Sequence, residues 1–244
     1  MRAKLLFTLT IVLAFTFRDL YGQKDCCCGT GDKTDSEPYL SGELSTPVSS
    51  ADPATYFNQE WLPGDIYLTN GEVARNRLLK YSGLVDELFW KVPGSNSIIK
   101  LDKELIERFH FLNFNGDTSV SFQRIKIKRN IITDSSEVLG QVIYEGSLSL
   151  FVLHAFLFEG SEVVYIDGIP CQKNIYAEKL VYIFSYDNNK TFVTRSLSRK
   201  SLYSFSPDNK DKIKEFLKSN DMGKSVNNSY LIRLTQFLGT LVKQ

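Results

Sequence analysis

The chain of 244 residues is poor in the side chains that carry most enzyme chemistry, with only 2 histidines and 4 cysteines. Two histidines cannot build a three-histidine zinc site, and the sequence has neither a His-Glu-x-x-His motif nor a Cys-x-x-Cys pair. The glycine-containing motifs of serine hydrolases, dinucleotide-binding folds and P-loop proteins are absent as well. The sequence therefore gives no support for these common catalytic classes.

The sequence also has little net charge. It carries 29 basic and 28 acidic residues, a formal charge of +1. A charge of this size does not steer a protein towards nucleic acid or an anionic membrane. The local basic run from Arg124 to Arg129 alternates with isoleucine, which predicts a strand with one apolar and one solvated face rather than a nucleic-acid patch.

The first residues have the layout of an export signal. Arg2 and Lys4 precede 13 uncharged residues from Leu5 to Phe17, and Gly22 stands just before Gln23. This is the arrangement of a secretory signal peptide, and the run is shorter than the roughly 20 residues of a spanning helix. We therefore expect a signal peptide over 1–22 and export to the periplasm, the outer-membrane periphery or the exterior. We expect no transmembrane helix after cleavage.

The cysteines that remain after this cleavage are Cys26, Cys27, Cys28 and Cys171. An oxidising compartment permits a disulfide from the triplet to Cys171, whereas adjacent cysteines pair with each other only under strain. The Lys-Asp pair ahead of the triplet does not fit a lipoprotein signal. Three consecutive thiols do not readily bind one tetrahedral metal ion. The alternative is a triplet without a role, in a flexible tail. We expect no metal and no cofactor.

Three further regions follow the leader. Residues 23–58 are rich in Ser, Thr, Gly, Pro and Asp, which predicts a flexible, cysteine-containing tether. Residues 59–205 contain short alternating apolar runs between turn signals such as Asn70-Gly71, Asp167-Gly168 and Asp187-Asn188-Asn189. This pattern predicts an antiparallel meander that forms a sandwich or open barrel. The segment 102–109 fits a helical turn or a strand equally well.

The periodicity changes over residues 206–244. Ser206 and Pro207 suit an N-cap and a first helical residue, and two apolar stripes with helical spacing follow. The stripes are Ile213, Phe216 and Leu217, and then Tyr230, Leu231, Leu234, Phe237, Leu238 and Leu241. The sequence therefore predicts a mainly β protein with two short C-terminal α-helices that pack on the sheet or on each other.

Two stretches carry a recognisable order of structural motifs. Gly64-Asp65-Ile66-Tyr67-Leu68-Thr69-Asn70-Gly71 is followed by Leu78-Leu79-Lys80-Tyr81-Ser82 and Asp86-Glu87-Leu88. A helical ending runs from Lys200-Ser201-Leu202 to Lys212-Ile213-Lys214-Glu215-Phe216-Leu217-Lys218. In these stretches the chain resembles exported β-rich proteins of the Bacteroidota cell envelope, over most of residues 61–241. The resemblance implies a cell-envelope setting and no established activity.

The histidines and Cys171 are weak candidates for catalysis. His154 lies in the most apolar predicted strand, which favours a core histidine bonded to a backbone carbonyl, and His110 between two phenylalanines is interpreted in the same way. Cys171 follows Pro170, and nothing in the sequence marks its thiol as activated.

The acidic residues leave more room for chemistry. Asp86 with Glu87, and Glu159 with Glu162, are candidates for glycoside hydrolysis, which needs two carboxylates at a set separation. Solvated charges at strand ends explain the same residues. The segment 186–189 could bind calcium, but turn chemistry accounts for it as well.

These observations favour a secreted or cell-envelope binding or structural protein without catalytic residues. Its partner would be an envelope protein, a glycan or a lipid, and not nucleic acid. Two alternatives stay open: a carrier of a small hydrophobic ligand, because a barrel of about eight strands can hold one, and a carboxylate-dependent hydrolase. A thiol or metal protein that uses Cys26–Cys28 is a further, weaker alternative.

Overall fold

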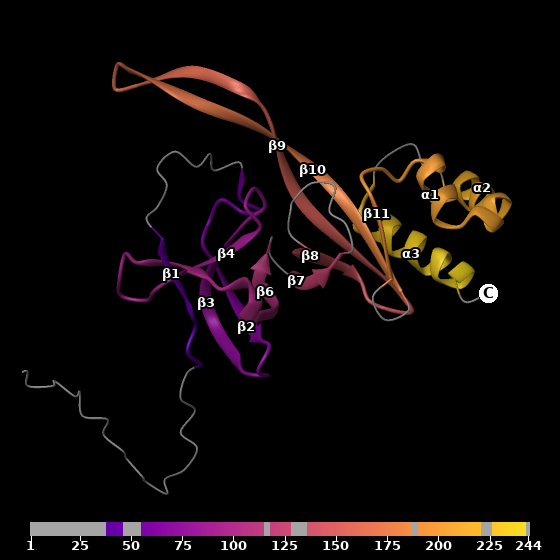
Figure 1. Ribbon diagram of the computed structural model, residues 1–244, viewed down its shortest axis with the longest axis horizontal. Helices are drawn as coiled ribbons and strands as arrows, with labels where there is room; N and C mark the ends of the chain where they lie inside the picture. Colours follow the sequence, from indigo (N-terminus) through magenta and orange to yellow (C-terminus); the bar gives the residue numbers. More distant parts are fainter. Residues whose placement is uncertain are drawn as a thin grey trace, which may run out of the picture. The chain divides into compact units, whose positions relative to one another are not determined.

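The structure, a computed structural model, describes residues 38–45, 55–114, 118–127, 136–186, 190–220 and 226–242. One antiparallel sheet of eleven strands, in the order β1-β5-β4-β3-β2-β6-β7-β8-β9-β10-β11, dominates it (Figure 1). The strands are β1 Gly42–Ser45, β2 Leu62–Leu68, β3 Val73–Ser82, β4 Glu87–Lys91, β5 Ile98–Leu101, β6 Ile106–Phe114, β7 Thr118–Lys126, β8 Glu137–Tyr144, β9 Leu148–Ile166, β10 Ile169–Tyr186 and β11 Lys190–Thr194. The predicted mainly β class with an open antiparallel arrangement is confirmed.

Two of the turns that the sequence marks lie in the described residues, Asn70-Gly71 between β2 and β3 and Asp167-Gly168 between β9 and β10. Gly71 takes φ 86° in the turn between β2 and β3, a conformation that glycine adopts without cost. The ambiguous segment 102–109 contains both alternatives, because a 3₁₀ turn at Lys103–Leu105 leads directly into β6. Gly42–Ser45, inside the segment expected to be a tether, pairs with β5 as β1.

The sheet curls so that its first half meets β8 and β9. The hydroxyl of Tyr81 on β3 donates to the carbonyl of Leu139 on β8 at 3.1 Å, although three strands separate β3 from β8 in the sheet. Gly83, just after β3, lies against β9, where an added Cβ would stand 2.3 Å from the carbonyl oxygen of His154. An apolar cluster rich in aromatic residues fills the inside of the curl. Its buried members are Leu40, Ile66, Leu68, Ala74, Leu79, Tyr81, Leu88, Leu101, Ile106, Phe109, Phe111, Phe122 and Leu139.

Three α-helices follow the sheet in the described part of the chain, where the sequence predicted two. They are α1 Arg199–Phe205, α2 Lys210–Ser219 and α3 Asn228–Val242, with a 3₁₀ turn at Pro207–Asn209. The two predicted stripes are buried on α2 and α3. The helix α1 was missed because it buries only Leu202 and so shows no stripe. Its N-cap is Ser198, whereas Ser206 makes no capping bond through its side chain.

The helices bury their stripes on one face of the last strands of the sheet. Leu148, Leu150 and Val152 of β9 contribute to this second cluster. Its other buried members are Tyr182, Phe184, Leu197, Leu202, Ile213, Leu217, Tyr230, Leu231, Leu234, Leu238 and Leu241. The C-terminal helices thus pack on the sheet, and Phe216 of α2 also stacks on Phe237 of α3, so both alternatives that the sequence left open occur.

The two longest strands extend beyond the rest of the sheet. β9 has 19 residues and β10 has 18, so the predicted strands at 148–158 and 163–166 are parts of one strand. β9 pairs with β8 only from Leu150 to Val152, and β10 pairs with β11 only from Tyr182 to Tyr186. We call the outer part of this hairpin, residues 156–180, the ribbon. It is the long orange hairpin that reaches past the other strands in Figure 1.

Candidate functional site

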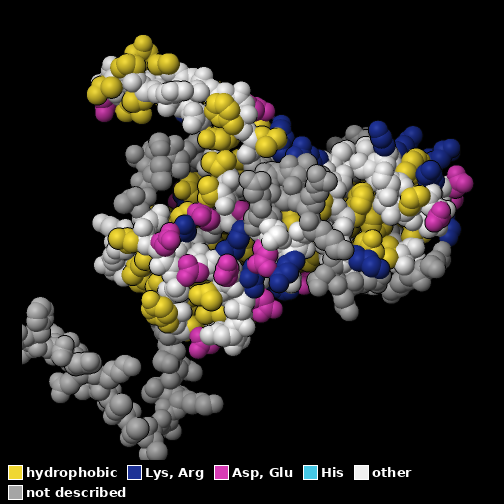
Figure 2. All heavy atoms as spheres, viewed as in Figure 1, with side chains coloured by type: hydrophobic (Ala, Val, Ile, Leu, Met, Phe, Trp, Pro, Cys, Tyr) yellow, Lys and Arg dark blue, Asp and Glu magenta, His cyan; other side chains and the backbone are white. Residues whose placement is uncertain are grey.

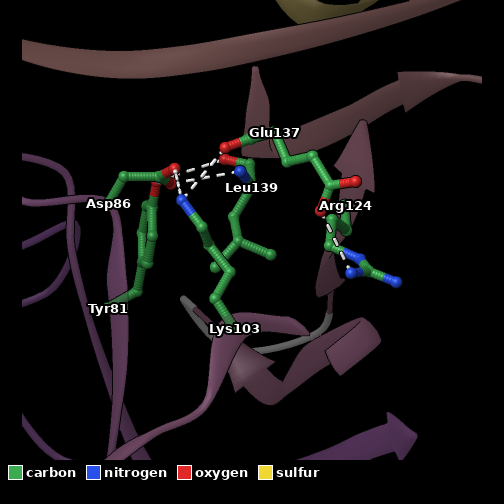
Figure 3. Close-up of polar contacts among 6 residues, drawn as sticks. All are labelled: Tyr81, Asp86, Lys103, Arg124, Glu137 and Leu139. Carbon is green, nitrogen blue, oxygen red and sulfur yellow. Dashed lines mark hydrogen bonds and ion pairs between the residues drawn. The ribbon is translucent and has the colours of Figure 1, made fainter. Parts of the chain in front are cut away.

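Two buried side chains, Tyr81 and Asp86, and the partly exposed Lys103 lie at the edge of β8 that β9 leaves open (Figure 3). The carboxylate of Asp86 accepts from the backbone N–H of Leu139 at 3.1 Å and from the hydroxyl of Tyr81 at 2.8 Å. The ammonium of Lys103 donates to Asp86 at 2.9 Å and to the backbone carbonyl of Glu137 at 3.0 Å. The Tyr81 hydroxyl also lies 3.1 Å from the carbonyl oxygen of Leu139, so its single proton is shared between these two acceptors. Side chains thus supply the hydrogen bonds that a neighbouring strand would otherwise make.

This cluster explains why β9 turns away from the sheet. Pairing between β8 and β9 begins at Gln141 and Val152, so the backbone groups of residues 137–139 have no strand beside them on that side. Buried backbone groups need partners, and Asp86, Tyr81 and Lys103 provide them. Asp86 reaches this position from a left-handed residue in the turn before β4, with φ 56°.

The electrostatics around Asp86 are those of a structural contact between the β3–β4 turn and β8. Asp86 is only 4% exposed, and this burial raises the pKa of its carboxyl group. The ion pair with Lys103 and the hydrogen bonds from Tyr81 and Leu139 act in the opposite direction. Burial and the neighbouring carboxylate raise the pKa of Tyr81 well above its ordinary value. The arrangement holds a carboxylate on three donors, which stabilises the fold.

The sequence singled out Asp86 with Glu87 as a candidate acid pair, and the structure separates their roles. A shallow cleft of about 420 Å³ lies beside them. Asp86 pairs with Lys103, whereas Glu87 lies 3.5 Å from the ammonium of Lys100, which also pairs with Glu43 at 2.9 Å. The two carboxylates therefore pair with different lysines, and Glu87 shares its lysine with Glu43. This differs from two free carboxylates that face each other across a substrate.

His154 makes two side-chain contacts at the base of the ribbon. Its Nδ1 lies 2.6 Å from a carboxylate oxygen of Glu178, and its Nε2 lies 2.8 Å from the amide oxygen of Gln141. The hydrogen bond to His154 lowers the pKa of Glu178. His154 is buried as expected, but these partners are side chains on β8 and β10 rather than a backbone carbonyl. The histidine therefore joins three strands where the ribbon begins.

His110 lies in a second, smaller polar group. Its Nε2 is 3.5 Å from the carboxylate of Asp65, which also lies 3.6 Å from Arg75. The other oxygen of that carboxylate accepts from the backbone N–H of Asn76, a left-handed residue with φ 50°. This group stabilises an irregular stretch of β3, where pairing with β2 changes register.

The remaining candidates from the sequence have ordinary surroundings. Glu159 and Glu162 are exposed and lie 3.5 Å from Lys179 and 3.9 Å from Lys173. The basic run behaves as predicted in its described part, because Ile125 is buried while Lys126 is exposed.

Of the four cysteines, Cys171 lies in the described part of the chain. Cys171 is a free, half-buried cysteine on β10. Cys26–Cys28 and the turn 187–189 lie outside the described residues, so the expected disulfide and the calcium alternative stay predictions. Within the described ranges, no group of three His, Cys, Asp or Glu residues is placed to bind a metal ion.

The ribbon ends in exposed apolar side chains, which the sequence did not single out as a site. Tyr165 is 73% exposed, Ile169 65% and Ile166 58%. Figure 2 shows hydrophobic side chains gathered at the tip of this hairpin. The signal was present in Val163-Val164-Tyr165-Ile166 before Asp167-Gly168, but an apolar strand pattern alone does not reveal whether another layer covers it.

Fold and surface together define an open, curled antiparallel sheet with C-terminal helices and a projecting apolar hairpin. No protein-family model, no curated protein and no solved structure matches the chain. Within the described part of the chain, no helix has both the length and the apolar character needed to cross a bilayer.

Proposed function

We propose that this chain is an exported, non-enzymatic binding or structural protein of the cell envelope that uses the ribbon as its contact surface. One observation carries the proposal: the ribbon exposes apolar side chains on both of its faces. Ile166 and Ile169 lie opposite each other on one face, and Tyr165 and Pro170 lie opposite each other on the other. Exposed apolar groups gathered in this way are typical of interaction sites.

The partners of Asp86 and Glu87 support the non-enzymatic part of the proposal. Asp86 is held by three donors, and Glu87 shares a lysine with Glu43. A general acid or base must reach a proton of the substrate, and these carboxylates are engaged in the fold or in ion pairs instead. The hydrolase alternative would need these groups to leave their partners.

Photo-crosslinking tests the contact surface directly. A photoreactive amino acid at Ile166 is expected to give a discrete covalent adduct in a bacterium that produces the exported protein. The same probe at Leu44, an exposed residue (71%) on β1, is the matched control and is expected to give none. An adduct from Leu44 but not from Ile166 would contradict the proposal.

Two further measurements test the remaining parts of the proposal. N-terminal sequencing of the exported protein should begin at Gln23, and a product that keeps Met1 would argue against the signal peptide. A purified hydrolytic activity that Glu87→Ala abolished without loss of the folded structure would establish the enzyme alternative instead.

A further inference from the structure

One face of the ribbon can pack against the same face of a second copy. Two residues directly opposite each other on β9 and β10 are called a row here, and each row can pack on the same row of the copy. In an antiparallel hairpin, residues directly opposite each other share a face. We call face A the side of the ribbon that carries Ile166. From the tip towards the base, its cross-strand pairs are Ile166–Ile169, Val164–Cys171, Glu162–Lys173, Gly160–Ile175 and Leu157–Ala177.

We propose that the ribbon binds a second copy of this chain, with face A against face A around a two-fold axis that runs along the ribbon. This inference rests on the proposed function, because it takes the ribbon as the contact surface and names its partner. The rotation lays β9 of one copy over β10 of the other. Each row of face A therefore meets the same row with its two residues exchanged.

Charge supports this arrangement at the middle row. Glu162 and Lys173 lie 3.9 Å apart within one ribbon. The two-fold axis places Glu162 over Lys173 of the second copy and Lys173 over its Glu162, so all four charges have opposite neighbours. A rotation that ran the ribbons in opposite directions would instead lay β9 over β9 and bring Glu162 against Glu162, which is unfavourable.

Side-chain size supports it on the base side of that row. Ile175, which is 39% exposed, would lie over Gly160, and Leu157 would lie over Ala177, so that large residues meet small ones. At the tip, Ile166 meets Ile169. Face-to-face packing of two sheets at about 10 Å buries such residues between them.

The size of the ribbon sets the expected strength of the contact. A two-stranded ribbon of this length is roughly 10 Å wide and 35 Å long, or about 350 Å² for each face. A stable interface usually buries about 800 Å² on each partner. We therefore expect a dimer that forms with rising concentration rather than a permanent one.

Charge reversal in separate chains tests the pairing without depending on contacts inside one ribbon. Sedimentation equilibrium of the full exported chain should show a monomer–dimer equilibrium for the wild type. Glu162→Lys alone and Lys173→Glu alone should each raise the dimer dissociation constant at least about tenfold, because like charges then face each other. An equimolar mixture of the two variants should recover a heterodimer, because opposite charges face each other again.

Three results would overturn the inference. They are a wild-type chain that stays monomeric at every concentration reached, single variants that dimerise like the wild type, and a mixture that stays monomeric. Glu43→Lys, a reversal of an exposed glutamate on β1, is the control and should leave the equilibrium unchanged. An Ile166 crosslink to a different protein, with no dimer, would overturn this inference and leave the proposed function standing. If there is neither an Ile166 crosslink nor a dimer, both this inference and the proposed function are overturned.

Discussion

At the scale of single residues, the buried carboxylate of Asp86 has the largest expected effect on stability. It lies where three donors meet, on backbone groups of β8 that no strand covers. Removing one partner from a buried ion pair leaves an uncompensated charge and unsatisfied backbone groups, which costs far more than the pair itself contributes.

We therefore expect Asp86→Ala to lower the free energy of unfolding by about 3 kcal/mol, because Lys103 and the Leu139 N–H lose their acceptor. The neighbouring substitution Glu87→Ala should cost about 0.5 kcal/mol, because its ion pair with Lys100 is partly exposed. Urea denaturation followed by circular dichroism measures both. Equal losses in the free energy of unfolding of the two variants would show that Asp86 does not hold the β3–β4 turn to β8.

The contact between Glu178 and His154 should make stability depend on pH. The hydrogen bond lowers the pKa of Glu178 below its ordinary value of 4.5, so the folded protein keeps this carboxylate charged to lower pH than the unfolded chain does. The resulting stabilisation is complete at pH values above 4.5, and it is lost as the pH falls through the lowered pKa of Glu178.

Glu178→Gln should accordingly reduce stability by at most about 1 kcal/mol near neutral pH, because the side chain is half exposed. The difference from the wild type should shrink as the solution is acidified past the carboxylate pKa. Thermal denaturation over a pH series measures it. A difference that grew at acidic pH would contradict the assignment.

The sequence revealed which residue types were present at the polar sites but not their partners. Asp86 and Glu87 are adjacent in the chain, yet one is buried among groups from β8 and the other pairs at the surface. The partners of Asp86 lie up to 53 residues away, so no local spacing indicates them. His154 was correctly expected to be buried, but its bonds to Glu178 and Gln141 depend on the strand register.

At the scale of elements, the approach of the β3–β4 turn to β9 decides how the sheet curls. Gly83 stands at this crossing, where an added Cβ would lie 2.3 Å from the backbone oxygen of His154 and 2.7 Å from the ring of Phe156. Backbone cannot rotate away as a flexible side chain can. A larger residue would therefore have to push the two elements apart.

Gly83→Ala should lower the free energy of unfolding by about 3 kcal/mol, because it overpacks this contact. Gly94→Ala is the matched control, since its added Cβ meets nothing within 4 Å and only its φ of +68° is unfavourable. We expect about 1 kcal/mol for the control from that backbone conformation. Chemical denaturation compares the two, and a Gly83 variant as stable as the control would rule out the close contact.

Most elements could be predicted from the sequence because their signals are local. Alternating apolar residues and turn dipeptides located most of the strands, and the stripes located α2 and α3. The helix α1 and the strand β1 escaped because each buries too little to show a pattern, with only Leu202 buried in α1. The true length of β9 escaped because the pattern of residues 157–162 is broken by glutamates and a glycine that face solvent.

At the scale of the whole molecule, the ribbon lies outside the buried core. The buried clusters lie in the sheet and helices, and they end at Ala155 on β9 and Val181 on β10. The ribbon beyond them is held by its own cross-strand bonds. Its apolar side chains therefore contribute little to the core, and their exposure agrees with the contact surface proposed above.

A shortened hairpin tests this division most directly. Phe158 and Tyr176 face each other across the ribbon with ring centroids 5.8 Å apart, so an Asn-Gly turn in place of residues 159–175 can join them. We predict that this variant keeps the free energy of unfolding of the wild type within about 0.5 kcal/mol and no longer associates with its partner. A shortened protein that loses its folded structure, or one that associates as the wild type does, would contradict the account.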